Sequence, residues 1–109
     1  MPKGYVIMTE AIKDQAGMDA YGRASAASMV QSGARVRAVD SNPHVLEGEW
    51  HGDRTVVVEF ESVEAAHAWY ASAGYQEALP LRQAAAETHA VVVAGLEPPT
   101  RTGGAKGTS

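Results

Sequence analysis

The sequence contains no cysteine among its 109 residues. This absence excludes disulfide-stabilised secreted scaffolds, zinc fingers, iron–sulfur clusters and thiol catalysis. Basic residues are also few: nine Lys plus Arg against 13 Asp plus Glu give a formal net charge of −4, which argues against binding to nucleic acid. No apolar run approaches the roughly 18 residues that a membrane span needs. We therefore expect a cytoplasmic protein that binds neither nucleic acid nor membranes.

Motifs for common cofactors are absent as well. The glycine-rich patterns GxGxxG and GxxxxGK and the nucleophile pattern GxSxG do not occur. The four histidines lack the HxH, HxxxH and HExxH spacings of metal ligands. We therefore expect no metal and no cofactor, although a haem, which needs only one axial ligand, stays open as an alternative with His67 or His89 in that place.

The hydrophobic pattern predicts one domain in residues 1–97, followed by a flexible polar tail at 98–109. Strand-like runs occur at residues 4–11, 34–40, 54–60 and 88–96, with a bent or interrupted strand at 44–50. Helical composition, spacing and capping residues predict helices at 14–32, from Ser62 onwards, and at 75–87. This order is the split β-α-β arrangement of an α+β, ferredoxin-like fold, in which a four-stranded antiparallel sheet carries its helices on one face.

The strands at 54–60 and 88–95 have near-continuous apolar sequences, which are typical of strands covered on both faces. The predicted helices cover only one face, and an exposed apolar sheet would be an aggregation liability. A second copy of the same sheet is the simplest cover. We therefore expect a homodimer that forms through the sheet face.

Several short motifs carry a resemblance to a known family. They are VLEGEW at 45–50, Arg54, VVVEFES at 56–62, AWY at 68–70 and Arg82. In these motifs, and across residues 4–95, the sequence resembles a bacterial domain-of-unknown-function family of the dimeric α/β-barrel, ferredoxin-like superfamily. The resemblance implies the ferredoxin-like fold and a dimeric α/β-barrel assembly. It transfers no catalytic residue, because the family has no general assigned activity.

Two residues are predicted to be catalytic. His67 lies on the predicted apolar face of its helix, where an imidazole titrates near neutral pH and suits a general base. Glu59 lies between Val58 and Phe60, where burial would raise its pKa or require a charged partner. The alternative is that His67 is a core histidine and that Glu59 pairs with a neighbouring arginine.

Four residues are predicted to bind a ligand. Arg37 would hold a carboxylate or enolate oxygen with its planar guanidinium. Trp50, Trp69 and Tyr70 hold much of the aromatic surface. As alternatives, Tyr70 belongs to the core and Trp69 covers the dimer partner.

The predicted topology points to another possible site at one end of the sheet. Antiparallel pairing of the first strand brings Glu10, Thr55 and His89 to that end, with Arg54 on the opposite face. A carboxylate beside an imidazole suits acid–base chemistry, and a simple ion pair at the rim is the alternative.

Together these features predict a homodimeric protein that binds a small organic molecule between sheet and helices. A cofactor-independent isomerase, lyase or oxygenase is one interpretation, based on the fold and on the pocket-compatible composition. The alternative is a non-catalytic dimeric ligand-binding or stress-related module.

Overall fold

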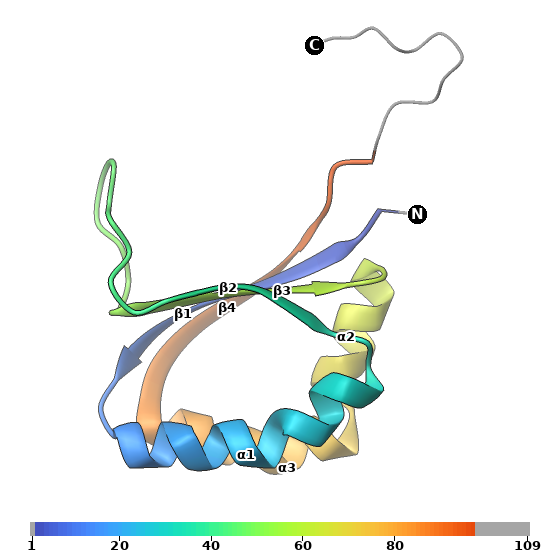
Figure 1. Ribbon diagram of the computed structural model, residues 1–109, viewed down its shortest axis with the longest axis horizontal. Coiled ribbons are helices and arrows are strands. Elements are labelled where there is room, and N and C mark those ends of the chain that lie inside the picture. The colour runs from blue at the N-terminus through green and yellow to red at the C-terminus, as the bar shows by residue number, and fades with distance from the viewer. Residues whose placement is uncertain (1, 98–109) are drawn as a thin grey trace, which may run out of the picture.

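A computed structural model describes residues 2–97 of the chain (Figure 1). The elements in chain order are β1 Gly4–Ile12, α1 Gln15–Gln31, β2 Arg35–Asp40, β3 Arg54–Phe60, α2 Val63–Ala71, α3 Ala73–Ala85 and β4 Ala86–Ala94. The predicted tail at 98–109 lies outside the described residues.

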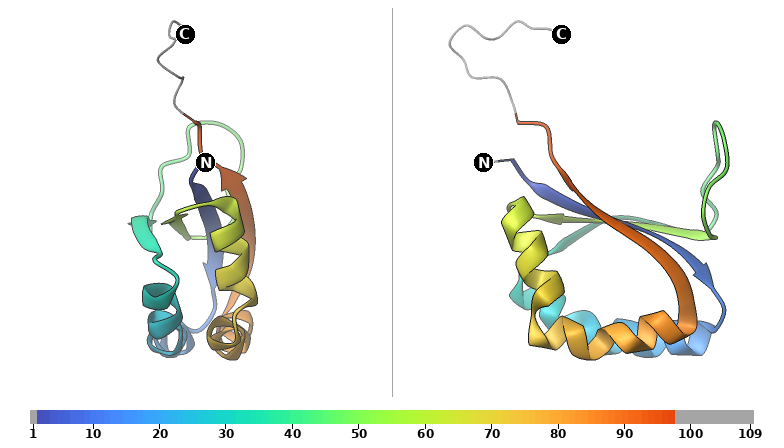
Figure 2. Two further views of the ribbon diagram at one scale, coloured as in Figure 1. Left: turned by 90° about the vertical axis from the view of Figure 1, so that its right-hand side faces the viewer. Right: turned by 180° about the vertical axis from the view of Figure 1, so that it is seen from behind.

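The strands form one antiparallel sheet with the order β2-β3-β1-β4. All three helices lie on the same side of this sheet, and α1 runs beside α3 (Figures 1 and 2). The predicted α+β, ferredoxin-like architecture is confirmed. The first strand is central, so its side chains contact both neighbouring strands and the helices.

Burial alternates along β1 as expected for a strand covered by helices on one face. Val6, Met8 and Glu10 point towards the helices and are almost fully buried. Tyr5 and Ile7 lie between them in the chain, point the other way and are only half-buried. The sheet therefore has a helix face, which is covered, and an outer face, which is open in the single chain.

The register of α2 differs from the prediction. The expected apolar face included His67 and Tyr70, but the helix turns Ala66 and Trp69 inwards and leaves His67 and Tyr70 exposed. Trp69 is only 2% exposed, and its ring lies 5.3 Å from that of Phe60. The larger apolar area of the indole explains this choice, since burial free energy scales with area. The suggestions that Tyr70 is a core residue and that Trp69 covers a partner were wrong.

The segment between β2 and β3 is also different from the prediction. Residues 44–50 form no strand; residues 41–53 form a loop that stands away from the sheet on the side opposite the helices (Figure 1). Gly48 and Gly52 have positive φ values of 76° and 80°, which favour glycine and turn the chain. A Cβ on Gly52 would lie only 2.4 Å from the backbone of Glu10. The loop therefore returns to the sheet directly against Glu10.

Candidate functional site in the cavity beneath the sheet

Glu10 and Arg54 meet on the helix face of the sheet. The register of β1 and β3 places the two residues directly opposite each other, so both side chains point to the same face. Arg54 Nε lies 3.1 Å from Glu10 Oε1, and the side chain of Glu10 is 1% exposed against 28% for Arg54. The prediction that Arg54 lies on the face opposite Glu10 was wrong.

The same register separates Glu10 from His89. Thr9, not Glu10, is the partner of His89 and Thr55, and a shift of one residue moves a side chain to the other face. The imidazole of His89 instead stacks on that of His51, with ring centroids 3.7 Å apart and planes 8° from parallel. The expected pair of carboxylate and imidazole therefore does not form.

A cavity of about 150 Å³ lies between the sheet and α1. Its apolar wall includes the three methionines Met8, Met18 and Met29 together with valines of β2 and β3. Its polar groups come from Glu10, Arg54, Tyr21 and Ser25. An apolar cavity of about 150 Å³ accommodates benzene. The space therefore suits a molecule about as large as one six-membered ring.

Small residues of α1 keep this cavity open. Gly22 lines it, and a Cβ built on Gly22 would have no neighbour within 4 Å. Ser25 lies one turn further on and bends its hydroxyl back towards the helix backbone, 3.4 Å from Gly22 O. Glycine inside a helix costs about 1 kcal/mol relative to alanine. Gly22 is exposed, so it lies at the rim of the cavity, where the absence of a side chain leaves the entrance open.

Burial makes Glu10 an unusual carboxyl. Removal from water raises the pKa of Glu10 above its ordinary value, and the guanidiniums of Arg54 and Arg82 only partly oppose this rise. A carboxyl with a raised pKa is better suited to accept a proton near neutral pH than an ordinary surface carboxyl.

The ion pair of Glu10 and Arg54 lacks hydrogen-bond geometry. Glu10 Oε1 and Arg54 Nε are both buried, and neither has a hydrogen-bond partner within residues 2–97. Buried polar atoms without partners are rare because each costs free energy, and they often mark a place where water or a ligand binds. Both atoms belong to residues of the cavity wall.

A second set of buried polar groups lies behind Tyr21. Arg82, 5% exposed, donates from Nη1 to the hydroxyl of Tyr75 at 2.6 Å and contacts Met8 Sδ at 3.7 Å. The hydroxyls of Tyr75 and Tyr21 are 2.9 Å apart. This chain connects α3 to α1 and ends at a residue of the cavity wall.

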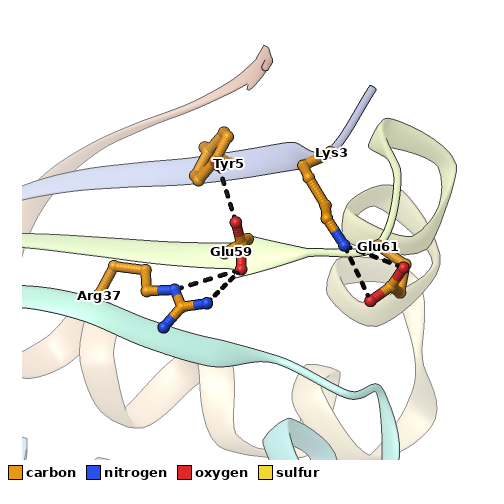
Figure 3. A network of polar contacts seen from close by, with 5 residues as sticks. All are labelled: Lys3, Tyr5, Arg37, Glu59 and Glu61. Carbon is orange, nitrogen blue, oxygen red and sulfur yellow. Dashed lines mark hydrogen bonds and ion pairs between the residues drawn. The ribbon is translucent and has the colours of Figure 1, made fainter. Parts of the chain in front are cut away.

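Glu59 and Arg37 lie together on the outer face of the sheet (Figure 3). Arg37 donates to Glu59 Oε1 at 2.8 Å from Nη2, and the hydroxyl of Tyr5 donates to Oε2 at 2.8 Å. The hydrogen bonds from Tyr5 and Arg37 lower the pKa of Glu59. The predicted pairing of Glu59 with an arginine is confirmed; the arginine is Arg37, which lies at a bulge between Val36 and Ala38.

His67 and Tyr70 share a different cavity, at the edge of the sheet beside β4. It measures about 280 Å³ and is otherwise lined by Val6, Ala90, Val91 and Val92. The structure therefore brings His67 and Tyr70 together but places them apart from both glutamate pairs.

The two tryptophans lie in separate places. Trp50 belongs to the loop at 41–53, and its Nε1 donates to Thr55 Oγ1 at 2.8 Å. It lines a hollow of about 390 Å³ with Val45 and Leu46, the latter 95% exposed. Trp69 lies in the core and its ring centroid is 4.2 Å from that of Tyr75.

Sequence reasoning missed the roles of Tyr21, Tyr75 and Arg82. One signal was available: Tyr75, Ala78, Leu79 and Arg82 follow the i, i+3, i+4, i+7 spacing of a buried helix face, and all four are buried. An arginine on such a face needs buried hydrogen-bond partners. Tyr21 has a similar signal, since Met18, Tyr21, Ser25 and Ser28 follow the spacing of one helix face and all four are buried.

Solved structures of similar architecture agree with this fold. A protein of unknown function from Rhodopseudomonas palustris matches with 22% identity over 89% of this chain and 85% of that chain, at a TM-score of 0.75. SnoaB, a cofactor-independent oxygenase from Streptomyces nogalater, matches with 8% identity over 90% and 97% of the two chains, at 0.61. A dimeric protein of unknown function and ferredoxin-like fold from Bacteroides fragilis matches with 13% identity over 84% and 95%, at 0.57. The protein therefore has the ferredoxin-like fold.

The family follows from the sequence match. The model of the Domain of unknown function (DUF1330) matches residues 3–96, so the chain belongs to this family. Among curated proteins, none matches the sequence significantly. No helix within residues 2–97 is long and apolar enough to cross a membrane. In the same residues, no three His, Asp or Glu side chains gather as metal ligands would.

Proposed function

We propose that this protein binds a small organic molecule in the cavity between the sheet and α1 and transfers a proton to or from it. Glu10 acts as the base, and Arg54 holds an oxygen of the ligand. The observation that carries this proposal is the pair of buried atoms Glu10 Oε1 and Arg54 Nε, which belong to cavity-wall residues and have no hydrogen-bond partner in residues 2–97.

The chemistry needs no cofactor. Glu10 removes a proton from a carbon next to a carbonyl group, and the electrons of the broken C–H bond move to the carbonyl oxygen. The guanidinium of Arg54 stabilises the resulting enolate. In a β,γ-unsaturated ketone the enolate is conjugated with the C=C bond, so return of the proton to the far end of that bond gives an isomer, and atoms and electrons balance. In a saturated ketone the proton returns to the same carbon, and the result is exchange with solvent. The similarity of fold to SnoaB, described as a cofactor-independent oxygenase, supports cofactor-free chemistry as a class.

We also propose that the protein is a homodimer formed through the outer face of the sheet. Val91 and Val93 are 53% and 41% exposed there, and Ile7 and Val57 of the neighbouring strands are only half-buried. The Bacteroides fragilis protein of similar fold is described as dimeric. We expect the two sheets to bury more than about 2,000 Å² in total, as obligate dimers do.

A second candidate is a binding module without catalysis. The cavity of His67 and Tyr70 favours it, because valine and alanine form most of the remaining wall and the space is larger than the cavity of Glu10. In this reading His67 and Tyr70 bind the ligand and Glu10 has a structural role.

Deuterium exchange tests the proposed chemistry without knowledge of the natural substrate. Small cyclic ketones of one ring are incubated with the protein in D₂O, and loss of the α-proton signal is followed by NMR. We expect catalysed exchange that Glu10→Gln removes. Glu61→Gln is the matched control, since this carboxylate is exposed and pairs with Lys3 at 3.1 Å. Glu61→Gln should exchange as the wild type does.

Three further variants decide between the sites. Gly22→Leu places a branched side chain at the exposed rim of the cavity and should lower exchange. Exchange that stays unchanged in both Glu10→Gln and Gly22→Leu would disprove the proposal. If exchange is instead lost in Glu59→Gln or His67→Ala, the chemistry belongs to the residues that the sequence suggested.

A further inference from the structure

A chain of three buried side chains ends at the cavity. Arg82, Tyr75 and Tyr21 are 5%, 0% and 8% exposed. Arg82 Nη1 lies 2.6 Å from the Tyr75 hydroxyl, which lies 2.9 Å from the Tyr21 hydroxyl. Tyr21 lines the cavity that Glu10 and Arg54 also line.

The chemistry of these groups favours one direction for the hydrogen bonds. A guanidinium only donates, so the oxygen of Tyr75 accepts from Arg82. Burial raises the pKa of Tyr75, which therefore keeps its proton. If Tyr75 also accepted from Tyr21 through its second lone pair, its own buried proton would lack an acceptor. If Tyr75 donates to Tyr21, only the Tyr21 proton lacks an acceptor within residues 2–97, and Tyr21 lines the cavity. We therefore assign the donor role to Tyr75.

The buried charges also favour a ligand that carries negative charge. Two guanidiniums, those of Arg54 and Arg82, act on one carboxylate, Glu10. These three groups carry a formal excess of one positive charge while Glu10 is ionised; the carboxylate of Asp53, which also acts on Glu10, is exposed to water. When Glu10 takes a proton from the ligand, the negative charge moves to the ligand and the total does not change.

We infer that Tyr21 donates a hydrogen bond to a ligand oxygen that carries negative charge, so that the ligand is a small one-ring enolate, phenolate or carboxylate. This inference rests on the proposed cavity and adds the chemical class of its ligand. Tyr75 and Arg82 are positioning residues: they orient the Tyr21 proton and polarise it, because hydrogen bonds in a chain strengthen one another.

Two probes of one ring size test the inference. In 4-fluorophenol the hydroxyl can give its proton to Glu10, whereas 4-fluorotoluene has a methyl group in its place. Fluorine NMR gives the affinity of each probe and, for the phenol, shows whether the bound form is ionised. We expect the wild type to bind 4-fluorophenol at least about tenfold more tightly than 4-fluorotoluene, and as the phenolate.

Variants separate the roles of the tyrosines. Tyr21→Phe should lower the affinity for 4-fluorophenol by about tenfold and leave that for 4-fluorotoluene unchanged. Tyr75→Phe should reduce the same preference by a smaller factor, although Tyr75 does not line the cavity. If Tyr21→Phe fails to fold, Tyr75→Phe still tests the inference. Tyr5→Phe is the control, because its hydroxyl bonds to Glu59 on the outer face.

The outcomes are distinct. Equal affinities for the two probes that Tyr21→Phe does not change would overturn the inference and leave binding in the cavity intact. Failure of the wild type to bind either probe would overturn both the proposed function and the inference. A phenol preference that falls in Tyr21→Phe and Tyr75→Phe, but not in Tyr5→Phe, supports both.

Discussion

The two faces of the sheet carry the same pair of residue types in different surroundings. On the helix face, Arg54 lies beside Glu10, which is 1% exposed, and burial raises the pKa of Glu10. On the outer face, Arg37 lies beside Glu59, which is 12% exposed, and hydrogen bonds from Tyr5 and Arg37 lower the pKa of Glu59. The difference lies in hydrogen bonding and water, not in the residues themselves.

This comparison indicates which pair is available for chemistry. Both carboxylate oxygens of Glu59 accept hydrogen bonds, so its charge is already stabilised. Glu10 Oε1 has an opposite charge nearby but no hydrogen bond within residues 2–97. A carboxylate that is desolvated and incompletely bonded binds a proton more readily than one that is fully bonded. We therefore expect the outer pair, Arg37 and Glu59, to stabilise the fold, and the inner pair, Arg54 and Glu10, to react with a ligand.

The largest expected effect tests the structural role of the outer face. Val57→Lys places an ammonium group among apolar side chains of that face, where a partner sheet would leave it without water or a counter-charge. We expect loss of the dimer or insoluble protein, measured by light scattering. Val30→Lys on α1, where Val30 is 79% exposed, should remain dimeric. A monomeric wild type would refute the proposed assembly.

The second-largest expected effect is the difference in stability between removal of Arg54 and removal of Arg37. Arg54→Ala leaves the carboxylate of Glu10 buried without its partner and should lower the free energy of unfolding by about 2–4 kcal/mol at neutral pH. Arg37→Ala should cost clearly less, because the Arg37 side chain is 52% exposed and water can replace it. Urea denaturation of both variants measures the difference. Equal losses would show that the two faces do not differ in the way described.

The pH dependence of stability should have opposite signs at the two glutamates. The folded pKa of Glu10 is raised, so its contribution to stability is complete below the ordinary carboxyl pKa and is lost as pH rises through the raised value. The folded pKa of Glu59 is lowered, so its contribution is present above the ordinary value and is lost as pH falls through the lowered value.

Denaturation between about pH 3 and about pH 8 measures this contrast. The stability of the wild type relative to Glu10→Gln should fall as pH rises through the range just above the ordinary carboxyl pKa. The stability relative to Glu59→Gln should fall as pH drops through the range below it. If both differences in stability changed with pH in the same direction, the surroundings assigned to Glu10 and Glu59 would be wrong.

The smallest effect concerns the cavity itself. Gly22→Ala should raise the free energy of unfolding by about 0.5–1 kcal/mol, since alanine favours the helix and its Cβ meets open space. Thermal denaturation measures the gain. Gly17→Ala is the contrasting variant on the same helix, because its Cβ would lie 2.9 Å from Ala85 Cβ and from Asp14 Oδ2. An equal gain at both positions would mean that the space around the added Cβ does not decide the effect.

Apart from the interrupted strand expected at 44–50, the sequence was sufficient for the order of elements and the sheet topology. Apolar periodicity and capping residues are local signals, and only a few topologies are compatible with such an order. The buried face of α2 was harder to predict, because two pairs of residues follow helical spacing. These pairs are His67 with Tyr70 and Ala66 with Trp69. The choice between them depends on contacts of Trp69 with Phe60 and Tyr75, which are distant in the chain.

The site was harder to predict than the fold. An error of one residue in the register between β1 and β3 was enough to assign Glu10 and Arg54 to opposite faces. The chain from Arg82 to Tyr21 requires α1 and α3 to dock side by side, which no local pattern reports. The local signals therefore revealed the strands and helices, but not which of their side chains meet.

The central position of β1 has a consequence for how the molecule is made. β1 leaves the ribosome well before the two strands with which it pairs, since Gly4 lies opposite both Phe60 and Ala94. Such non-local pairing slows folding, because long loops must close before the contacts form. Glu10 acquires its neighbour on β4, Thr88, only after nearly the whole domain has been synthesised. The cavity wall itself comes from residues 8–58, but the surroundings of Glu10 also include β4 and Arg82. These surroundings are therefore a late product of folding, and a nascent or truncated chain carries the cavity residues without them.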